Sequence, residues 1–471
     1  MAERKDTRGP IGAAALEELR THLGGRVIGP ADGDYNGARA VWNGMIDRHP
    51  VAIVRCVGVA DVLAAVRFAR SHNLVVAVRG GGHNVAGFGT CDGGMVIDLS
   101  PMKGVRVDPQ GRTAHAQPGL SWGEFDRETQ AFGLATTGGL VTTTGIAGFT
   151  LGGGIGWLMR KYGLTIDNLI SADVVTADGQ LLSASATSHP DLFWALRGGG
   201  GNFGIVTSFE YRLHPVGPMV LGGAVFHPAE KARDLLRFYN RWITTLPDEL
   251  TSMVAFLTAP PLPFIPQPLH GTAMIAVAVC YAGAPADGES VVQPLISFGP
   301  PAVAHVGPVP YTILQGAFDA SAPHGIHAYW KTHYVPDLSD PAIDALLAQT
   351  ARMRSLSPFA TLHLHHLEGA VRRADPNGTA FRHRTPRYAM NIVGLWAANE
   401  QADPHIAWVR QTYDAMQSFS TGAPYLNFLG DEGLDRVRAA YGPDTYDRLV
   451  AVKNRYDPTN FFRLNQNIKP T

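Results

Sequence analysis

The stretch Val78-Arg79-Gly80-Gly81-Gly82-His83-Asn84 places three consecutive glycines and a histidine at the end of an apolar run. The run over residues 74–78 predicts a buried strand. Because glycine has no Cβ, the following turn can take positive φ, and a ligand can lie against its backbone. Consecutive N–H groups in such a turn form an anion-binding nest. The stretch therefore predicts a pyrophosphate cradle with Arg79 at its base and His83 at its lip. Taken alone, it also fits a plain strand end with a surface histidine.

A second glycine-rich stretch covers residues 136–157 and reads TTGGLVTTTGIAGFTLGGGIGW. Glycine at this density is unfavourable inside a helix or a strand. We interpret the stretch as backbone wrapped closely round a flat or phosphorylated ligand. The alternative is a mobile linker, but linkers are usually polar, whereas Leu140, Ile146 and Phe149 favour burial.

Length and composition bound the class of protein. A chain of 471 residues is too long for one hydrophobic core and predicts two or three domains. The formal net charge of −1 gives no field that would attract nucleic acid or an anionic membrane. The three cysteines, Cys56, Cys91 and Cys280, form no CxxC motif and argue against a disulfide framework or a structural zinc site. With no apolar leader or membrane-length apolar run visible, we expect a soluble cytoplasmic enzyme.

Element patterns divide the chain near residue 217. Before it, strands such as the short 51–55 and the long 203–213 occur together with helices such as 60–71. After it, long strands over 274–281, 361–368 and 388–396 alternate with helices over 228–244, 341–353 and 403–418. The second pattern predicts an antiparallel sheet with helices on one face, so the fold class is α+β.

Four motifs in order resemble the berberine bridge enzyme-like flavoproteins of the vanillyl-alcohol oxidase superfamily. The glycine turn at residues 79–84 looks like the turn that carries the flavin in that family, and Gly145 to Gly156 is similar to its second glycine-rich loop. Tyr162-Gly-Leu-Thr-Ile-Asp-Asn168 looks like the segment after that loop. Asp457-Pro-Thr-Asn-Phe-Phe-Arg-Leu-Asn-Gln-Asn467 resembles the family's C-terminal signature.

The resemblance implies a two-domain fold of the PCMH type. Residues 1–217 would form the FAD-binding domain, with its core at about 45–217. Residues 218–419 would form the α+β substrate domain, and residues 420–471 would complete the FAD domain. The resemblance also implies that His83 bonds covalently to the 8α-methyl group of the flavin.

By the same resemblance, the residues expected to hold FAD come from both glycine-rich stretches, one later strand and the C-terminal segment. They are Arg79, Gly80, Gly81, Gly82, His83, Asn84, Gly87, Thr137, Gly138, Gly139, Thr142, Thr144, Gly145, Gly148, Gly153, Gly154, Gly156, Trp157, Asn168, Val206, Tyr425, Asn427, Asn465 and Asn467.

At two positions this chain departs from the residues that are usual in the family it resembles. Many family members attach the flavin a second time through a cysteine, and Val141 stands at that position. Valine cannot form a thioether, so we expect a single link, as in the bacterial 6-hydroxynicotine oxidase type. Thr144 stands where the family is said to gate oxygen, usually with valine in oxidases and leucine in dehydrogenases. The surrounding pattern is also similar to bacterial members that stabilise a flavin N5-oxide.

Candidate catalytic residues follow from the same resemblance. Tyr425 would reach the reactive edge of the flavin, although a phenol needs a nearby cation or the flavin environment to act as a base. Asn391 matches a substrate-facing position and could orient a substrate, but its amide is not basic. His363 and His365 alternate with His366 and Glu368 on the two faces of one strand. His366 or Glu368 could be the missing base, and a metal site at these histidines lacks a further ligand cluster.

The expected function is an FAD-dependent oxidase. It would remove a hydride from an alcohol, an amine or an activated carbon of a small molecule, such as a phenolic compound, and O2 would reoxidise the flavin. A dehydrogenase with another electron acceptor and a flavin carrier without turnover are the alternatives. Loops 259–268 and 299–328 and the strand faces within 361–396 would line the substrate pocket.

Overall fold

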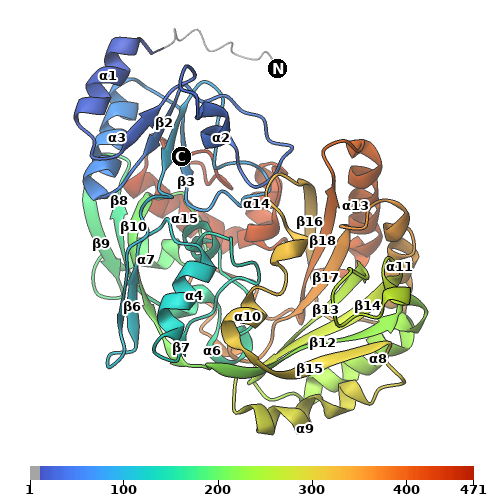
Figure 1. The fold of residues 1–471 in the computed structure, drawn as a ribbon. Helices are drawn as coiled ribbons and strands as arrows, with labels where there is room; N and C mark the ends of the chain where they lie inside the picture. Colours follow the sequence, from blue (N-terminus) through green and yellow to red (C-terminus); the bar gives the residue numbers. More distant parts are fainter. Residues whose placement is uncertain (1–10) are drawn as a thin grey trace.

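The computed structural model describes residues 11–471, so the first ten residues of the predicted FAD domain lie outside the described part (Figure 1). A small four-stranded sheet comes first in the chain, with the order β1-β2-β4-β3. Its strands are β1 (Arg26–Ile28), β2 (Ala52–Arg55), β3 (Val76–Arg79) and β4 (Met95–Asp98). Strands β2 and β3 run parallel to β4. Helices α1 (Ala13–Thr21) and α3 (Val59–Ser71) share its apolar core, and α2 (Tyr35–Arg39) lies on the other side.

A five-stranded antiparallel sheet follows, with the order β5-β6-β10-β8-β9. It contains β5 (Val105–Asp108), β6 (Thr113–Ala116), β8 (Leu169–Val175), β9 (Leu181–Ser185) and β10 (Ile205–Arg212). Helix α4 (Trp122–Gln130) begins at a capping box, in which the side chains of Ser121 and Glu124 accept hydrogen bonds from each other's backbone N–H groups. A two-stranded ladder, β7 (Leu134–Ala135) with β11 (His214–Pro215), lies below it.

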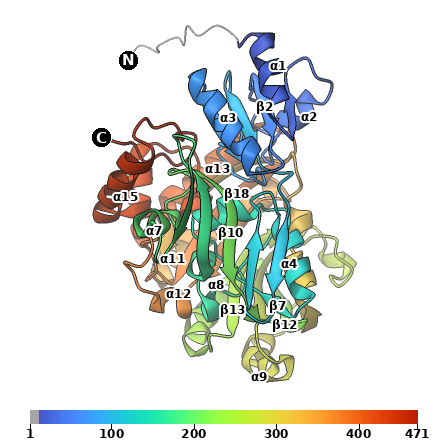
Figure 2. The same ribbon diagram turned by 90° about the vertical axis from the view of Figure 1, so that its left-hand side faces the viewer.

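The C-terminal helices return to this N-terminal part. Helices α7 (Pro190–Leu196), α14 (Leu434–Tyr441) and α15 (Pro443–Tyr456) pack in one apolar cluster with α4 and the five-stranded sheet. Figure 2 shows α15 beside α7, where Arg455 and Tyr456 both contact the Asp191 carboxylate. The two ends of the chain therefore build one core.

The intervening residues form a seven-stranded antiparallel sheet, with the order β15-β12-β14-β13-β17-β18-β16. The strands are β12 (Met219–Pro228), β13 (Leu250–Thr258), β14 (Ala273–Tyr281), β15 (Val303–Pro310), β16 (His327–Val335), β17 (Thr361–His366) and β18 (Tyr388–Trp396). Helices α8 (Ala232–Trp242), α9 (Pro285–Ile296), α11 (Asp340–Thr350) and α13 (Ala402–Met416) cover one face (Figure 1). The predicted α+β class and two-domain architecture are confirmed.

Strand alternation sends every second side chain of this sheet away from those helices. Val254, Leu362, Leu364 and Ile392 pack against the helices. Met253, His363, His365 and Asn391 point to the opposite face, toward the N-terminal part of the molecule. The short helix α10 (Tyr311–Gln315) connects β15 to the segment that borders this second face.

The second glycine-rich stretch is more ordered than its composition predicts. Residues Ile146–Leu151 form helix α5, and Met159–Tyr162 form α6. The glycines concentrate at the ends of α5, at Gly145 and Gly152, so that only Gly148 weakens its interior. Across residues 11–471, we find no helix with both the length and the apolar character needed to cross a bilayer.

Candidate active site

A cavity of about 380 Å³ lies between the N-terminal part and the open face of the seven-stranded sheet. This volume falls in the range of small-molecule sites, about 300–1,000 Å³. Its walls come from the first glycine turn, the second glycine-rich stretch, the open faces of β13, β17 and β18, and the C-terminal segment. Fifteen of the sequence-predicted residues line it: Arg79, Gly80, Gly81, Gly82, His83, Asn84, Gly139, Thr144, Gly145, Gly148, Val206, Asn391, Tyr425, Asn427 and Asn465.

The two glycine-rich segments touch each other at the cavity wall. A Cβ added to Gly81 would lie 2.4 Å from the Gly145 nitrogen, and one added to Gly145 would lie 2.4 Å from the Gly81 nitrogen. A Cβ on Gly152 would lie 1.9 Å from Oδ1 of Asn427. The glycines therefore allow the backbones of two distant segments to touch and let the Asn427 side chain of the C-terminal segment approach the second of them closely.

The remaining predicted residues shape the cradle from behind rather than lining it. Asn168 donates from Nδ2 to the carbonyls of Tyr162 and Leu164, and Thr137 donates to the Gly163 carbonyl. Because these side chains satisfy backbone groups, they are not available to a ligand. The predicted residues outside the cavity lining are Gly87, Thr137, Gly138, Thr142, Gly153, Gly154, Gly156, Trp157, Asn168 and Asn467, and their contact with FAD stays a prediction.

His83 is held at the edge of the cavity by a ring contact and by hydroxyl groups. Its imidazole stacks on Trp42 with 5.5 Å between ring centroids and 19° between planes. Nε2 lies 3.1 Å from the Thr143 hydroxyl, and Nδ1 lies 3.5 Å from that of Thr144. Burial and the neighbouring His324 lower the pKa of His83 to about 4. The imidazole is therefore neutral at pH 7 and retains the lone pair of a nucleophile.

Arg79 lines the cavity, but its charge is already paired. Its Nη2 donates to the buried Asp98 carboxylate at 2.8 Å, and its Nη1 donates to the Ala40 carbonyl at 3.3 Å. The ion pair connects the ends of β3 and β4, which are neighbours in the sheet. Arg79 therefore braces the glycine turn, and the anion-binding groups of the turn are its backbone N–H groups.

Tyr425 brings a protonated hydroxyl to the cavity. Its oxygen accepts hydrogen bonds from the Gly154 N–H at 2.9 Å and from Nδ2 of Asn427 at 3.0 Å. Because these two donors occupy both lone pairs, the hydroxyl proton remains free to be donated. Burial raises the pKa of Tyr425 to about 12. In this arrangement the phenol is a hydrogen-bond donor rather than a base.

The open face of β17 contributes two histidines. His363 and His365 line the cavity, with ring centroids 5.7 Å apart. Burial lowers the pKa of His363 to about 4, and burial together with His363 lowers that of His365 well below its usual value. Both rings are therefore neutral at pH 7. Nowhere along residues 11–471 do three or more His, Cys, Asp or Glu side chains gather as a metal ligand set.

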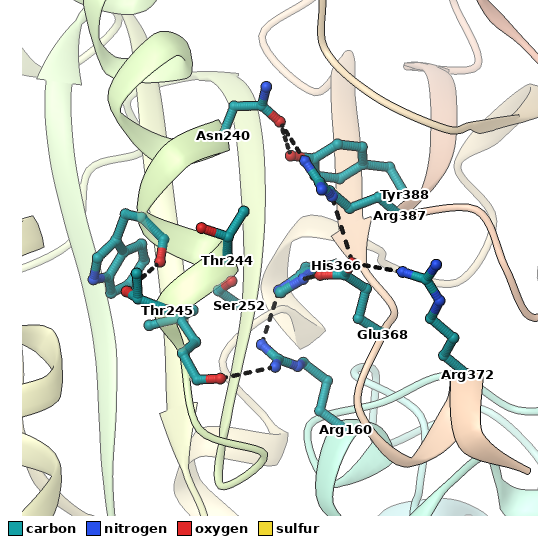
Figure 3. Close-up of polar contacts among 12 residues, drawn as sticks. Arg160, Asn240, Thr244, Thr245, Ser252, His366, Glu368, Arg372, Arg387 and Tyr388 are labelled. Atoms are coloured by element: carbon teal, nitrogen blue, oxygen red, sulfur yellow. Dashed lines mark hydrogen bonds and ion pairs between the residues drawn. The ribbon is translucent and has the colours of Figure 1, made fainter.

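His366 and Glu368 lie behind the strand, so their suggested role as the base is wrong. Arg160 Nη1 donates to His366 Nδ1 at 3.1 Å, and His366 Nε2 donates to Glu368 at 2.7 Å (Figure 3). Arg372 and Arg387 also contact that carboxylate. With both nitrogens of His366 engaged on the face away from the cavity, neither group reaches a substrate. The cluster instead joins α6 to the end of β17.

Several wall residues were missed because they lie far apart in the sequence. Trp42, Trp330 and Phe428 give the cavity aromatic walls, and Phe462 also lines it. The expected loop 299–328 does line the cavity, through Phe318, Ser321 and Ala322. The expected loop 259–268 does not line the cavity, because Ala259 and Ile265 pack on Phe226 and Met274 at the far end of the sheet. Single aromatic residues, whether in loops or on a strand such as β16, carry no sequence pattern that would have marked them.

Comparisons with known proteins agree with this site. The family model for the FAD binding domain matches residues 50–185, and the model described as berberine and berberine like matches residues 424–469. An FAD-linked oxidoreductase of Dictyostelium discoideum is 31% identical over 432 residues, which is 91% of each chain. The (R)-6-hydroxynicotine oxidase of Paenarthrobacter nicotinovorans is 30% identical over 454 residues, 95% of this chain and 97% of that protein.

The solved structures show the same relationship. The crystal structure of 6-hydroxy-D-nicotine oxidase from Arthrobacter nicotinovorans superimposes with a TM-score of 0.85 at 28% identity, covering 95% of this chain and 98% of that one. The cradle also fits a flavin dinucleotide, because its glycine end can receive the pyrophosphate and its apolar walls a flat ring. Buried oxygen atoms of Asn391 and Asn465 have no partner among the described residues and await one there. The chain therefore belongs to the berberine bridge enzyme-like, PCMH-type FAD-linked oxidoreductases.

Proposed function

We propose that this protein is an oxidase that carries FAD on a single covalent link to His83 and oxidises a small organic molecule. One observation carries the proposal: a continuous cavity joins the glycine turn that bears His83 to the polar open face of β17 and β18. When bound, FAD supplies the redox chemistry, accepting a hydride from the substrate at N5 and passing the electrons to O2 to give H2O2.

The residues around His83 support one covalent link. The neutral imidazole has the lone pair that bond formation requires, and Trp42 fixes the ring plane. Val141 lines the cavity where relatives of this type can carry a linking cysteine. The described cysteines, Cys56, Cys91 and Cys280, are buried outside the cavity lining.

The proposal includes O2 as the electron acceptor that reoxidises the flavin. Thr144 lines the cavity beside His83, with a side chain close in size to the valine of oxidases. (R)-6-hydroxynicotine oxidase and xylooligosaccharide oxidase, both relatives by sequence, are oxidases by name. A dehydrogenase on the same fold, which would use another electron acceptor, is the competing proposal.

The covalent link is tested by acid precipitation of the purified holoenzyme. We expect yellow colour in the wild-type pellet and its loss in His83→Ala, because that substitution removes the attachment atom. His22→Ala, at an exposed histidine directly after α1, should keep the colour and serves as the matched control. Colour retained in the His83→Ala pellet would contradict the single link, and colour released to the supernatant of the wild type would show a dissociable cofactor.

The oxygen step is tested separately and requires no natural substrate. The holoenzyme is reduced with dithionite without oxygen, air is admitted, and the return of flavin absorbance is followed. We expect reoxidation within seconds together with H2O2, detected by a peroxidase-coupled dye. Reoxidation over many minutes, with fast electron transfer to an added quinone, would instead identify a dehydrogenase.

A further inference from the structure

We propose that the substrate is an uncharged molecule whose reacting hydroxyl group donates its proton to Nδ1 of His363. This inference rests on the proposed oxidase function and names the substrate class and the proton acceptor of the same site. Four features of the cavity carry it. The lining residues at the substrate end are uncharged, and the tautomer of His363 is fixed. Two buried polar atoms near His363 have no partner among the described residues, and the groups that face its ring carry no charge.

The substrate end of the cavity has polar groups without charge. Arg79 is the one charged side chain among the described cavity-lining residues, and Asp98 already pairs with it under the glycine turn. The walls at the sheet are Met253, Phe318, Trp330, Val393 and Phe428. A charged substrate would lose its hydration there without gaining a counterion, which is strongly unfavourable.

Thr361 fixes the tautomer of His363. The Thr361 hydroxyl donates its one proton to the Phe256 carbonyl at 2.8 Å, since a carbonyl can only accept. The same hydroxyl oxygen lies 3.0 Å from Nε2 of His363, so it must accept a proton from that nitrogen. A neutral imidazole with a proton on Nε2 has its lone pair on Nδ1. His363 is therefore prepared to accept a hydrogen bond from a ligand.

Two further polar groups surround this lone pair without partners of their own. Asn391 lies directly across from His363 in the β17–β18 register, and its buried Oδ1 has no partner among the described residues. Nε2 of His365 is likewise buried without one, and His365 is only 5% exposed. Buried polar atoms are normally hydrogen-bonded, so these groups indicate a polar ligand at this point of the cavity.

The groups that face His363 explain why its ring is neutral before the substrate arrives. They are Thr361 and His365 on the same strand, Asn391 on β18, Ala255 on β13 and Phe318 in the segment after α10. None of the five carries a charge at pH 7, because burial keeps His365 neutral as well. When a substrate O–H bond breaks, its electron pair stays on oxygen and its proton passes to Nδ1, which gives an imidazolium.

The test compares four probes of similar size with the oxidised holoenzyme, without oxygen. They are benzyl alcohol, benzyl methyl ether, benzoate and benzylamine, and binding is measured as the change in flavin absorbance. We expect benzyl alcohol to bind at least about tenfold more tightly than the ether, which lacks the proton, and than either charged probe. Equal or tighter binding of benzoate or benzylamine would overturn the proposal.

Three variants assign the effect to His363 and Thr361. His363→Leu should reduce the preference for the alcohol over the ether by about tenfold, since leucine has no hydrogen-bond acceptor while ether binding reports an intact cavity. Thr361→Val should also reduce the preference, because it frees the tautomer, and Thr361→Ser should restore it. An unchanged preference in His363→Leu would overturn the role of this ring. A missing flavin would reject the oxidase proposal itself, whereas intact flavin without probe preference rejects only this inference.

Discussion

Tyr425 and Tyr441 are both buried, but their hydroxyl groups have opposite surroundings. The Tyr425 oxygen accepts two hydrogen bonds, from Gly154 and Asn427. The Tyr441 hydroxyl is buried without a partner among the described residues. A buried donor without an acceptor costs about 1–3 kcal/mol of folding free energy. The Tyr425 hydroxyl therefore stabilises the folded protein, whereas the Tyr441 hydroxyl destabilises it.

We therefore expect Tyr425→Phe to lower the free energy of unfolding by about 1–3 kcal/mol, because it strands the Gly154 N–H. Tyr441→Phe should leave the stability unchanged or raise it by up to about 1 kcal/mol, because it removes an unsatisfied group. Urea unfolding followed by tryptophan fluorescence measures both. Equal effects of the two substitutions would contradict the hydrogen-bond assignment.

The side chains of β17 could be predicted from the sequence only in part. Alternation along one strand correctly separates His363 and His365 from His366, since the period of a strand is two. It does not tell which face meets the cavity, because that depends on the helices that cover the other face. The choice of His366 or Glu368 as the base was wrong for this reason, and the bond from Thr361 to His363 could not be predicted from the pattern.

At the scale of elements, the contact between the two glycine-rich segments decides the shape of the cradle. We expect Gly145→Ala to destabilise the protein by about 1–3 kcal/mol or more, since its Cβ would collide with the Gly81 backbone, which cannot rotate away. The flavin content of the purified protein should fall as well. Thermal unfolding and absorbance at the flavin maximum measure these two effects.

Gly37→Ala is the matched control for that substitution. Gly37 lies inside α2, and a Cβ there would meet no atom within 4 Å. Alanine is favoured over glycine inside a helix by about 0.5–1 kcal/mol, so this variant should be unchanged or slightly more stable. A loss of stability in Gly37→Ala as large as in Gly145→Ala would show that the segment contact is not the cause.

The arrangement of apolar residues in the sequence predicts β14, β17 and β18. It misses β12, β13, β15 and β16 of the same sheet. Strand β15 contains Gly307, Pro308 and Pro310, and proline is tolerated there because β15 is an edge strand. In β12, Gly223 has a φ of +136°, and a Cβ there would lie 1.9 Å from the His305 carbonyl oxygen of β15. Glycine and proline usually end a strand. Their presence inside β12 and β15 is explained only by the neighbouring strands of the sheet.

At the scale of the whole molecule, a buried carboxyl lies where α4 meets α10. Gln315 donates from Nε2 to Asp126 Oδ2 at 2.8 Å, and Oδ1 has no partner among the described residues. Burial raises the pKa of Asp126 to about 7 from its usual 3.8. The folded protein therefore keeps a proton on this group over a range of pH in which the unfolded chain releases it.

This proton makes the stability depend on pH. Between about pH 4 and pH 7 the folded state binds more protons at Asp126, so its contribution to the free energy of unfolding falls as pH rises, and it is constant above. Asp126→Asn lacks this proton. Its Tm relative to wild type should therefore increase from about pH 5 to about pH 8. Asp431→Asn, at an exposed residue, is the control, and a parallel change in both variants would contradict the assignment.

The cavity is assembled from parts of the chain that are made at different times. The glycine turn at residues 79–84 is synthesised well before Tyr425, Phe462 and Asn465, which line the same cavity. Lys453, buried against Asp457, ties that late segment to the carbonyls of Asn202 and Phe462. The cavity wall is consequently complete only after residue 466 has been made, and a chain truncated before residue 460 lacks Phe462 and Asn465 of that wall.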